Sequence, residues 1–161
     1  MKPAFKVIGI DPGLAETGFG IVQGSGSRIR EYTFGTIRTS KAEILPNRLH
    51  HIFSELRSVL DSQQPDLMVI EDIFSVKQYP KSGIALGKVC GAILLAASEC
   101  GIASMEVPVR EVKRILTGNG NASKSQTERA VRHLLERDSP IRPSHASDAM
   151  ALALVGMFRY A

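Results

Sequence analysis

The stretch Phe5-Lys-Val-Ile-Gly-Ile-Asp-Pro-Gly13 determines how the rest of this chain is interpreted. Its β-branched and aromatic residues predict a buried strand over Phe5–Asp11, and the Pro-Gly pair predicts a turn directly after it. Asp11 therefore places a carboxylate at the end of an apolar strand, where removing the charge from water is costly unless a partner compensates it. Because hard divalent cations bind through oxygen ligands, the stretch predicts a metal site at this strand end.

Two later stretches carry the same signal. Glu71 follows the apolar run in Leu67-Met-Val-Ile-Glu-Asp72, so it also ends a predicted strand. His145 and Asp148 are three residues apart in Ser144-His-Ala-Ser-Asp-Ala149, and on a helix they would share one face. Ligands of open α/β sheets bind outside the carboxyl ends of the strands. If the last helix packs beside those ends, the four side chains can hold two metals about 4 Å apart for phosphoryl chemistry.

The remaining pattern predicts an α/β fold in one domain, residues 1–161. We expect strands over Phe5–Asp11, 17–23, 28–38, 66–71 and 102–107, and helices over 46–64, 83–100, 112–116, 123–137 and 144–160. Both Ser123 and Ser125 are followed three residues later by Gln or Glu, so the capping residue of the fourth helix is ambiguous. A strand meander followed by alternating helices and strands predicts a mixed, mostly parallel five-stranded sheet with helices on both faces.

Composition indicates an ordinary globular protein with a basic surface. Of 161 residues 43% are hydrophobic and 22% charged, which excludes wholesale disorder. The net charge of +4 suits a polyanionic partner without requiring one. Two cysteines are too few for a zinc site or a disulfide framework, which fits a reducing compartment. With neither a secretion signal nor an uninterrupted apolar run of about 18 residues, we expect a cytoplasmic protein and no membrane contact.

These residues, in this order, resemble the RuvC family of Holliday-junction resolvases, within the ribonuclease H-like superfamily. The resemblance covers nearly the whole chain and rests on Gly9-Ile-Asp-Pro-Gly13, Thr17-Gly-Phe-Gly20, Ile37-Arg-Thr39, Ile70-Glu-Asp-Ile-Phe74, Arg110-Glu-Val-Lys113, Gly118-Asn-Gly-Asn-Ala-Ser-Lys-Ser-Gln126 and His145-Ala-Ser-Asp-Ala149. It implies a ribonuclease H-like fold and a structure-selective endonuclease that resolves four-way DNA junctions in homologous recombination and DNA repair. Cleavage would proceed by paired, symmetric, metal-dependent nicks that leave 5′-phosphates. The resemblance also implies a homodimer and a branch-migration motor partner of the RuvA and RuvB type.

The resemblance further implies that Asp11, Glu71 and Asp148 are ligands of Mg²⁺ or Mn²⁺. Most family members have an aspartate where this chain has His145, although some carry histidine. Imidazole is a softer ligand than carboxylate, so His145 would favour manganese over magnesium. His145 could instead act as a general acid or base.

Three more residues are candidates for contact with DNA. Lys113 and Lys124 match basic residues that the family uses near the scissile phosphate, where a cation neutralises backbone charge and stabilises the transition state. Phe74 lies where the family presents an aromatic ring to the bases at the junction centre, although a core phenylalanine is an equal alternative. We assign to a general basic surface Lys77, Lys81, Arg110 and Arg114.

Each candidate also has a purely structural interpretation. Asp11 could be a turn residue, and Glu71 a solvent-facing charge at a strand end. Asp148 could complement the dipole in the first turn of its helix, and His145 could be a cap. Lysines such as Lys113 and Lys124 are usually only solvated. For any one residue, the structural interpretation is about as good as the functional one. For all of them together, in this order and setting, the functional interpretation is favoured.

Three other functions fit parts of the pattern. A nucleotide phosphotransferase of the actin/hexokinase type also has Asp-x-Gly after its first strand, but it needs two domains, for which 161 residues are too few. A junction-binding module could have lost catalysis through the histidine at position 145, although the three intact carboxylates argue against this. A ribonuclease of the same fold is the third alternative, disfavoured by Phe74, Lys113 and Lys124.

Overall fold

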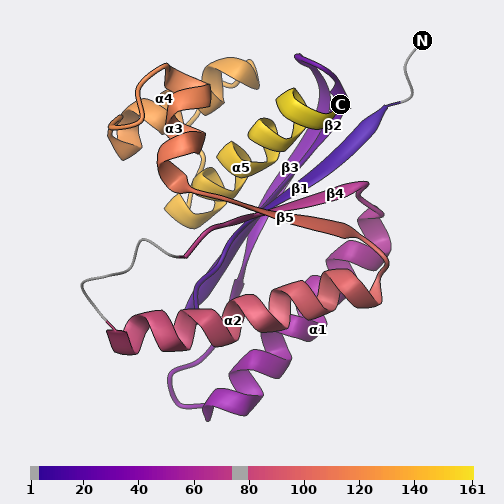
Figure 1. Cartoon of the computed structure of the whole chain (residues 1–161), viewed down its shortest axis with the longest axis vertical. Coiled ribbons are helices and arrows are strands. Elements are labelled where there is room, and N and C mark those ends of the chain that lie inside the picture. The colour runs from indigo at the N-terminus through magenta and orange to yellow at the C-terminus, as the bar shows by residue number, and fades with distance from the viewer. Residues whose placement is uncertain (1–3, 74–79) are drawn as a thin grey trace.

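The computed structural model describes residues 4–73 and 80–161 and shows a five-stranded sheet between two layers of helices (Figure 1). The strands are β1 (Phe5–Asp11), β2 (Glu16–Ser25), β3 (Arg28–Arg38), β4 (Leu67–Glu71) and β5 (Ala103–Val107). The helices are α1 (Leu45–Gln63), α2 (Pro80–Glu99), α3 (Val109–Thr117), α4 (Lys124–Leu134) and α5 (Ser144–Tyr160).

The sheet has the strand order β3-β2-β1-β4-β5. β1 pairs with β2, and β2 with β3, in antiparallel fashion, whereas β1–β4 and β4–β5 are parallel. The mixed α/β sheet is therefore confirmed, but the expectation that it is mostly parallel is wrong. The meander at the start of the chain supplies as many antiparallel pairings as the later crossovers supply parallel ones.

The parallel pairing of β1 with β4 brings two predicted site residues to one edge of the sheet. Ile10 is opposite Ile70 in the register, so Asp11 and Glu71 are the next residues along two neighbouring strands. Parallel strands end at the same edge. The two carboxylates are thereby neighbours although they are sixty positions apart in the sequence.

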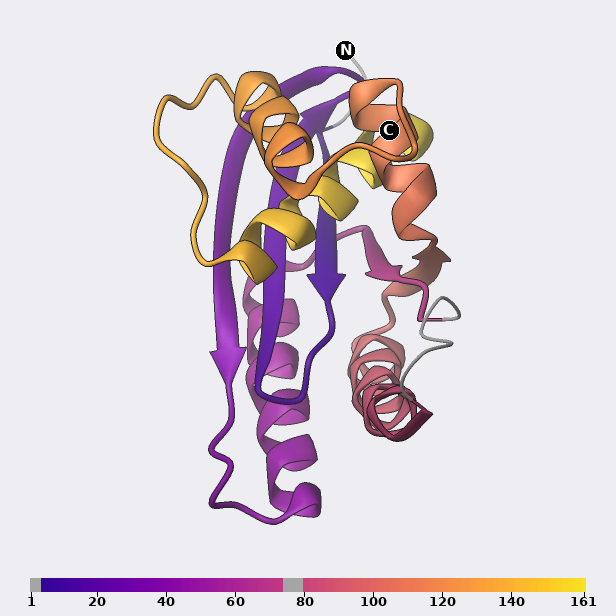
Figure 2. The same ribbon diagram turned by 90° about the vertical axis from the view of Figure 1, so that its left-hand side faces the viewer.

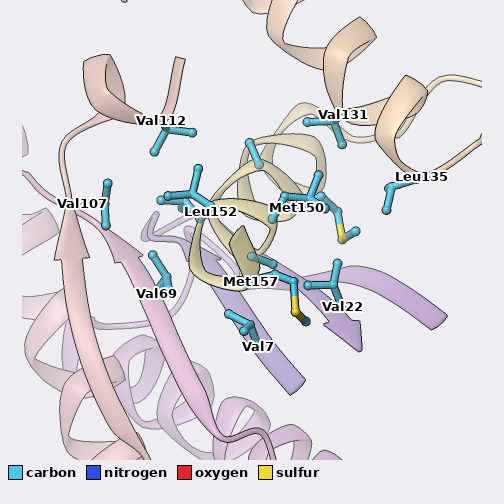
Figure 3. Close-up of a cluster of buried hydrophobic side chains, with 14 of the residues drawn as sticks. Val7, Val22, Val69, Val107, Val112, Val131, Leu135, Met150, Leu152 and Met157 are labelled. Carbon is cyan, nitrogen blue, oxygen red and sulfur yellow. The ribbon is translucent and has the colours of Figure 1, made fainter. Parts of the chain in front are cut away.

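Alternate residues of the strands fill two separate cores, one on each face. Val7, Val22, Val69 and Val107 point to the face covered by α3, α4 and α5, where they pack against residues such as Met150 (Figure 3). Ile8, Ile10, Ile21, Met68 and Ile70 point to the face covered by α1 and α2. Burial on both faces explains why β1 and β4 are apolar at almost every position.

Glycines in β1 and β2 let α5 approach the sheet closely. A Cβ at Gly9 would overlap the carbonyl oxygen of Ala149, and one at Gly18 would overlap the carbonyl oxygen of His145. Both contacts are with the backbone of α5, which cannot move aside as a flexible side chain could. These glycines therefore fix the position of the helix start that carries His145.

The ends of several helices differ from the sequence expectation. α2 begins at Pro80 rather than near residue 83, and α3 runs from Val109 to Thr117, beyond the single turn predicted over 112–116. The ambiguous cap of α4 is Ser123, whose Oγ accepts a bond of 3.1 Å from the Gln126 N–H while Gln126 Oε1 accepts one of 2.8 Å from the Ser123 N–H. This reciprocal pair fixes where α4 starts.

One helix within the described residues, Lys81–Glu99 of α2, is long and apolar enough to cross a membrane by length and composition alone. The helices of a folded core can meet the same criterion. The side of α2 that faces the sheet and α1 buries Val89, Cys90, Ile93, Ala96 and Ala97. Packing against the sheet and α1 therefore explains why this side of α2 is apolar.

Candidate active site

All six residues predicted to be catalytic line one pocket at the carboxyl ends of β1 and β4. Asp11 and Glu71 end their strands, Lys113 comes from α3 and Lys124 begins α4. His145 and Asp148 lie in the first turns of α5, whose start is close to the end of β1 in Figure 2. Phe74, the remaining candidate, lies outside the described residues.

Asp11 and His145 form the tightest polar contact of the pocket. His145 Nδ1 lies 2.6 Å from Asp11 Oδ2. Asp11 is buried, with 6% of its surface exposed, whereas the side chain of His145 is 40% exposed. If Nδ1 carries the proton and donates it to the carboxylate, Nε2 is left to accept a proton or to bind a metal.

Burial and mutual repulsion raise the pKa of two of the carboxyl groups. Burial is the largest cause for Asp11 and raises its pKa to about 6, while a hydrogen bond with Glu71 acts in the opposite direction. Burial also raises the pKa of Glu71 to about 8, and the neighbouring charge of Asp11 adds to this. The charge of Asp148 raises both values and that of Lys124 lowers both. The pocket thus concentrates more negative charge than its own lysines compensate.

The two lysines of the pocket differ in what they contact. Lys124 Nζ lies 3.3 Å from Asp148 Oδ2, and its side chain is 76% exposed. Lys113 makes no ion pair with any residue that the structure describes, and its carbonyl accepts a 2.7 Å bond from Thr117 Oγ1. Lys124 is held at the start of α4 by the Ser123 cap. Both ammonium groups can therefore meet an anion that enters the pocket, Lys124 by leaving Asp148.

Sequence reasoning missed the largely apolar wall behind these groups, which consists of Val109, Val112, Thr127, Ala151 and Leu152. Part of this wall could have been identified from the sequence, because its residues lie one helical turn from the predicted site residues. Thr127 is three residues after Lys124, and Ala151 and Leu152 are three and four after Asp148. Neighbours at these spacings lie on one helix face. This wall limits the access of water and so contributes to the raised pKa values.

The chemistry of these donors fits a divalent cation. Carboxylate oxygens suit magnesium, and imidazole together with carboxylate suits manganese. In the described part of the chain no three such side chains surround a common point as metal ligands do. Instead, Asp11 contacts His145 and Asp148 contacts Lys124.

Comparison with known proteins identifies the family. Residues 7–156 match the family described as crossover junction endodeoxyribonuclease RuvC. The chain is 36% identical to the member from Rhodopirellula baltica over 152 residues, 94% of this chain and 85% of that protein. It is 38% identical to the member from Thermosipho melanesiensis over 148 residues, 92% of this chain and 94% of that protein.

A solved structure agrees with the sequence match. The structure of Thermus thermophilus RuvC in complex with a Holliday junction substrate superposes with a TM-score of 0.90 at 32% identity, over 96% of this chain and 93% of that one. This likeness confirms the ribonuclease H-like fold expected from the sequence. The family match, the relatives and the superposition agree along almost the entire chain, which belongs to the RuvC family of crossover junction endodeoxyribonucleases.

Proposed function

We propose that this chain resolves four-way DNA junctions by paired, metal-dependent nicking in homologous recombination and DNA repair. The observation that carries the proposal is the convergence of three carboxylates, an imidazole and two lysines in one pocket of a RuvC-family fold. The complex of T. thermophilus RuvC with a Holliday junction supports the same class of substrate here. The products would carry 5′-phosphate and 3′-hydroxyl ends that a ligase can seal.

Asp11, Glu71, His145 and Asp148 would hold the metal, which we propose to be two Mg²⁺ or Mn²⁺ ions. Dependence on a divalent metal is general to this family of nucleases. The raised pKa values of Asp11 and Glu71 support these positions, because buried carboxylates that repel one another are stabilised by a cation. When bound, such ions stabilise the attacking and leaving oxygens of a phosphoryl displacement.

The protein's own residues would orient the substrate and handle protons. Lys124 would exchange Asp148 for a phosphate oxygen as DNA enters, and Lys113 would meet a second phosphate oxygen without losing a partner. Asp11 would hold the Nδ1 proton of His145, which fixes the tautomer and directs Nε2 into the pocket. His145 would then serve either as a ligand or as a general acid or base.

We also propose that the enzyme is a homodimer joined through the outer side of α2. Ile84 is 64% exposed and Leu95 54% exposed, and Gly91 lies between them with no atom of the described residues within 4 Å of a Cβ built on it. Positions 84, 91 and 95 share one face of the helix. This face is opposite the one that covers the sheet, and small side chains along it would allow two copies of α2 to pack closely. A two-fold dimer would place two active sites on symmetry-related strands of the junction.

We propose four further properties of this protein. Residues 1–161 would form a single nuclease domain, since the five helices of the described residues are built around one sheet. Phe74 would stack on bases at the junction centre. The protein would act in the cytoplasm, with a branch-migration motor of the RuvA and RuvB type as its partner.

The decisive experiment compares cleavage of a labelled synthetic four-way junction with that of a matched linear duplex, in manganese, magnesium or EDTA. We expect symmetric nicks in the junction alone, only with metal, and sealable by ligase. Junction binding without nicks in any metal would overturn the catalytic proposal. It would favour an inactive binding module, and His145→Asp would be the next protein to test.

A further inference from the structure

The exposed side of α3 carries two arginines that no carboxylate of the described residues neutralises. Arg110 and Arg114 are both exposed and make no ion pair with any residue that the structure describes. The acidic residue between them, Glu111, is instead bound by Arg159 of α5. Since Glu111 is already neutralised, this side of α3 presents uncompensated positive charge.

These arginines continue the positive side of the active-site pocket. Lys113 lines the pocket, and it is three residues from Arg110 and adjacent to Arg114 in sequence. Side chains three residues apart on a helix have Cβ atoms about 5–6 Å apart. Phosphates recur about every 3.4 Å of rise along one DNA strand. A strand whose scissile phosphate lies at Lys113 would therefore bring a neighbouring phosphate to Arg110. Arg114 lies four residues after Arg110, on the same face of α3, where it can meet the next phosphate.

The side chain of Arg110 is held in place by the loop that joins α3 to α4. A Cβ added at Gly120 would lie 3.0 Å from Arg110 Cγ and 3.4 Å from its Nε, so the arginine stem packs against the glycine backbone. The amide of Gly120 donates to no acceptor within the described residues, whereas Asn119 and Asn121 have their amides bonded to Thr117 Oγ1 and Asn119 Oδ1. A guanidinium and an open N–H thus lie close together, which suits a phosphate oxygen.

We propose that Arg110, Arg114 and the Gly120 amide form a phosphate-binding ridge that positions the DNA strand directly beside the scissile phosphate. The ridge rests on the proposed junction-cleaving function and deepens it by assigning the path of the cut strand across α3. Arg110 and Arg114 are positioning residues in this scheme. They bind the backbone and touch no reacting atom.

The test measures binding of a labelled four-way junction in EDTA over a range of salt concentrations, so that cleavage plays no part. Arg110→Gln and Arg114→Gln should each weaken binding about fivefold to tenfold and reduce the slope of log K against log salt by about 0.9. Arg110→Lys should keep most of the slope because it keeps the charge. Melting temperatures are measured in parallel, since Arg114 also lies in the last turn of α3, where a cation stabilises the helix.

Arg28→Gln provides the matched control. Arg28 is exposed at the start of β3, eight residues before Thr36, which pairs with Gly18 on the rung that contains Asp11. At about 3.3 Å per residue it is about 26 Å from that edge of the sheet, so its loss should not change the slope. A second probe replaces the phosphate beside the mapped nick with uncharged methylphosphonate. This should weaken binding of the wild type but not weaken binding of Arg110→Gln further.

The outcomes separate this proposal from the proposed function. Selective junction binding in which both glutamine variants keep the wild-type salt slope would overturn the ridge alone. A lower melting temperature with an unchanged slope would also overturn it, because Arg110 would then only support the loop. Absence of any DNA binding by the wild type would overturn both proposals.

Discussion

Asp11 is the one charged residue of the described chain that is buried, and its side chain bonds to His145 and Glu71. Asparagine has nearly the same shape but carries no charge. We therefore expect Asp11→Asn to reduce junction cleavage by about 100-fold or more while binding in EDTA stays within a fewfold of wild type. Single-turnover cleavage and fluorescence anisotropy measure the two quantities.

Asp138→Asn is the control for this change, because Asp138 is an exposed carboxylate outside the pocket. It should cleave as the wild type does. If Asp11→Asn lost binding together with its folded structure, Asp11 would have a structural role instead of a ligand role.

The imidazole of His145 should determine which metal works best. As a softer donor than carboxylate it favours manganese, so the wild type should cleave faster with Mn²⁺ than with Mg²⁺. His145→Asp should narrow that difference. The ratio of the two cleavage rates is measured for both proteins at equal free metal. Equal rates with both metals in both proteins would count against a ligand role for His145.

The raised pKa of Glu71 makes a prediction about stability without metal. Burial raises this pKa from 4.5 to about 8, so between these values the folded protein holds more protons than the unfolded chain. Stability in EDTA should therefore fall as pH rises from about 5 to 8.5, by roughly 1–3 kcal/mol. Urea unfolding across this range measures the effect. Glu71→Gln should flatten the dependence, and a slope as steep as that of the wild type would show that another group causes it.

At this scale the sequence predicted which side chains meet, but not how they pair. Asp11 and Glu71 could be placed because each ends an apolar run and parallel strands end together. The bond from His145 Nδ1 to Asp11 could not be foreseen, since it depends on how far α5 sinks toward the sheet. That depth is set by backbone contacts at Gly18, which sequence spacing does not report.

At the scale of elements, α5 is the part of the fold on which the site most depends. Gly18→Ala should push the start of α5 away from β2 because a Cβ there meets the backbone of His145. We expect a loss of about 1–3 kcal/mol in the free energy of unfolding. Cleavage by the fraction that remains folded should also fall, since His145 and Asp148 move together. Thermal unfolding and cleavage assays below the melting temperature test both effects.

Gly87→Ala is the matched control for thermal unfolding, in α2. Among the described residues, a Cβ at Gly87 would meet only Ile73 Cδ1, at 3.8 Å, which is an ordinary contact. Alanine should therefore stabilise the helix by about 0.5–1 kcal/mol. If Gly18→Ala also stabilised the protein and left cleavage unchanged, the close approach of α5 to β2 would not be needed for the site.

The elements themselves were predicted better than their ends and directions. The spacing of hydrophobic residues along the chain predicted the order of strands and helices, and β1 and α5 have their expected bounds. The start of α3 was missed because Pro108 caps it with extended backbone geometry and no side-chain bond. The number of antiparallel pairings was underestimated, because the expectation of a mostly parallel sheet rested on the alternation of helices and strands later in the chain. Pairing direction follows from connection length, which was short in both turns of the meander.

At the scale of the whole molecule, the two layers of helices have different tasks. The α3–α5 layer contributes four of the six predicted catalytic residues that line the pocket, whereas α1 and α2 contribute none of the lining residues. The outer side of α2 nevertheless exposes large apolar side chains, which the core of one copy does not bury. Paired nicking needs two pockets held at a fixed distance, so the layer without catalytic residues is free to hold two copies together.

Ile84→Glu tests this division. Burying a glutamate against its symmetry mate would cost several kcal/mol, so the variant should be monomeric at concentrations where the wild type is dimeric. Ile44→Glu is the matched control, because Ile44 is 65% exposed and Ile84 64% exposed, yet Ile44 lies at the start of α1. Analytical ultracentrifugation gives the oligomeric state, and a supercoiled cruciform plasmid reports whether the two nicks occur within one binding event. We expect Ile84→Glu to release nicked circles and Ile44→Glu to release linear product. If Ile84→Glu remained dimeric and still cut both strands together, the two-fold contact would lie on another surface of the molecule.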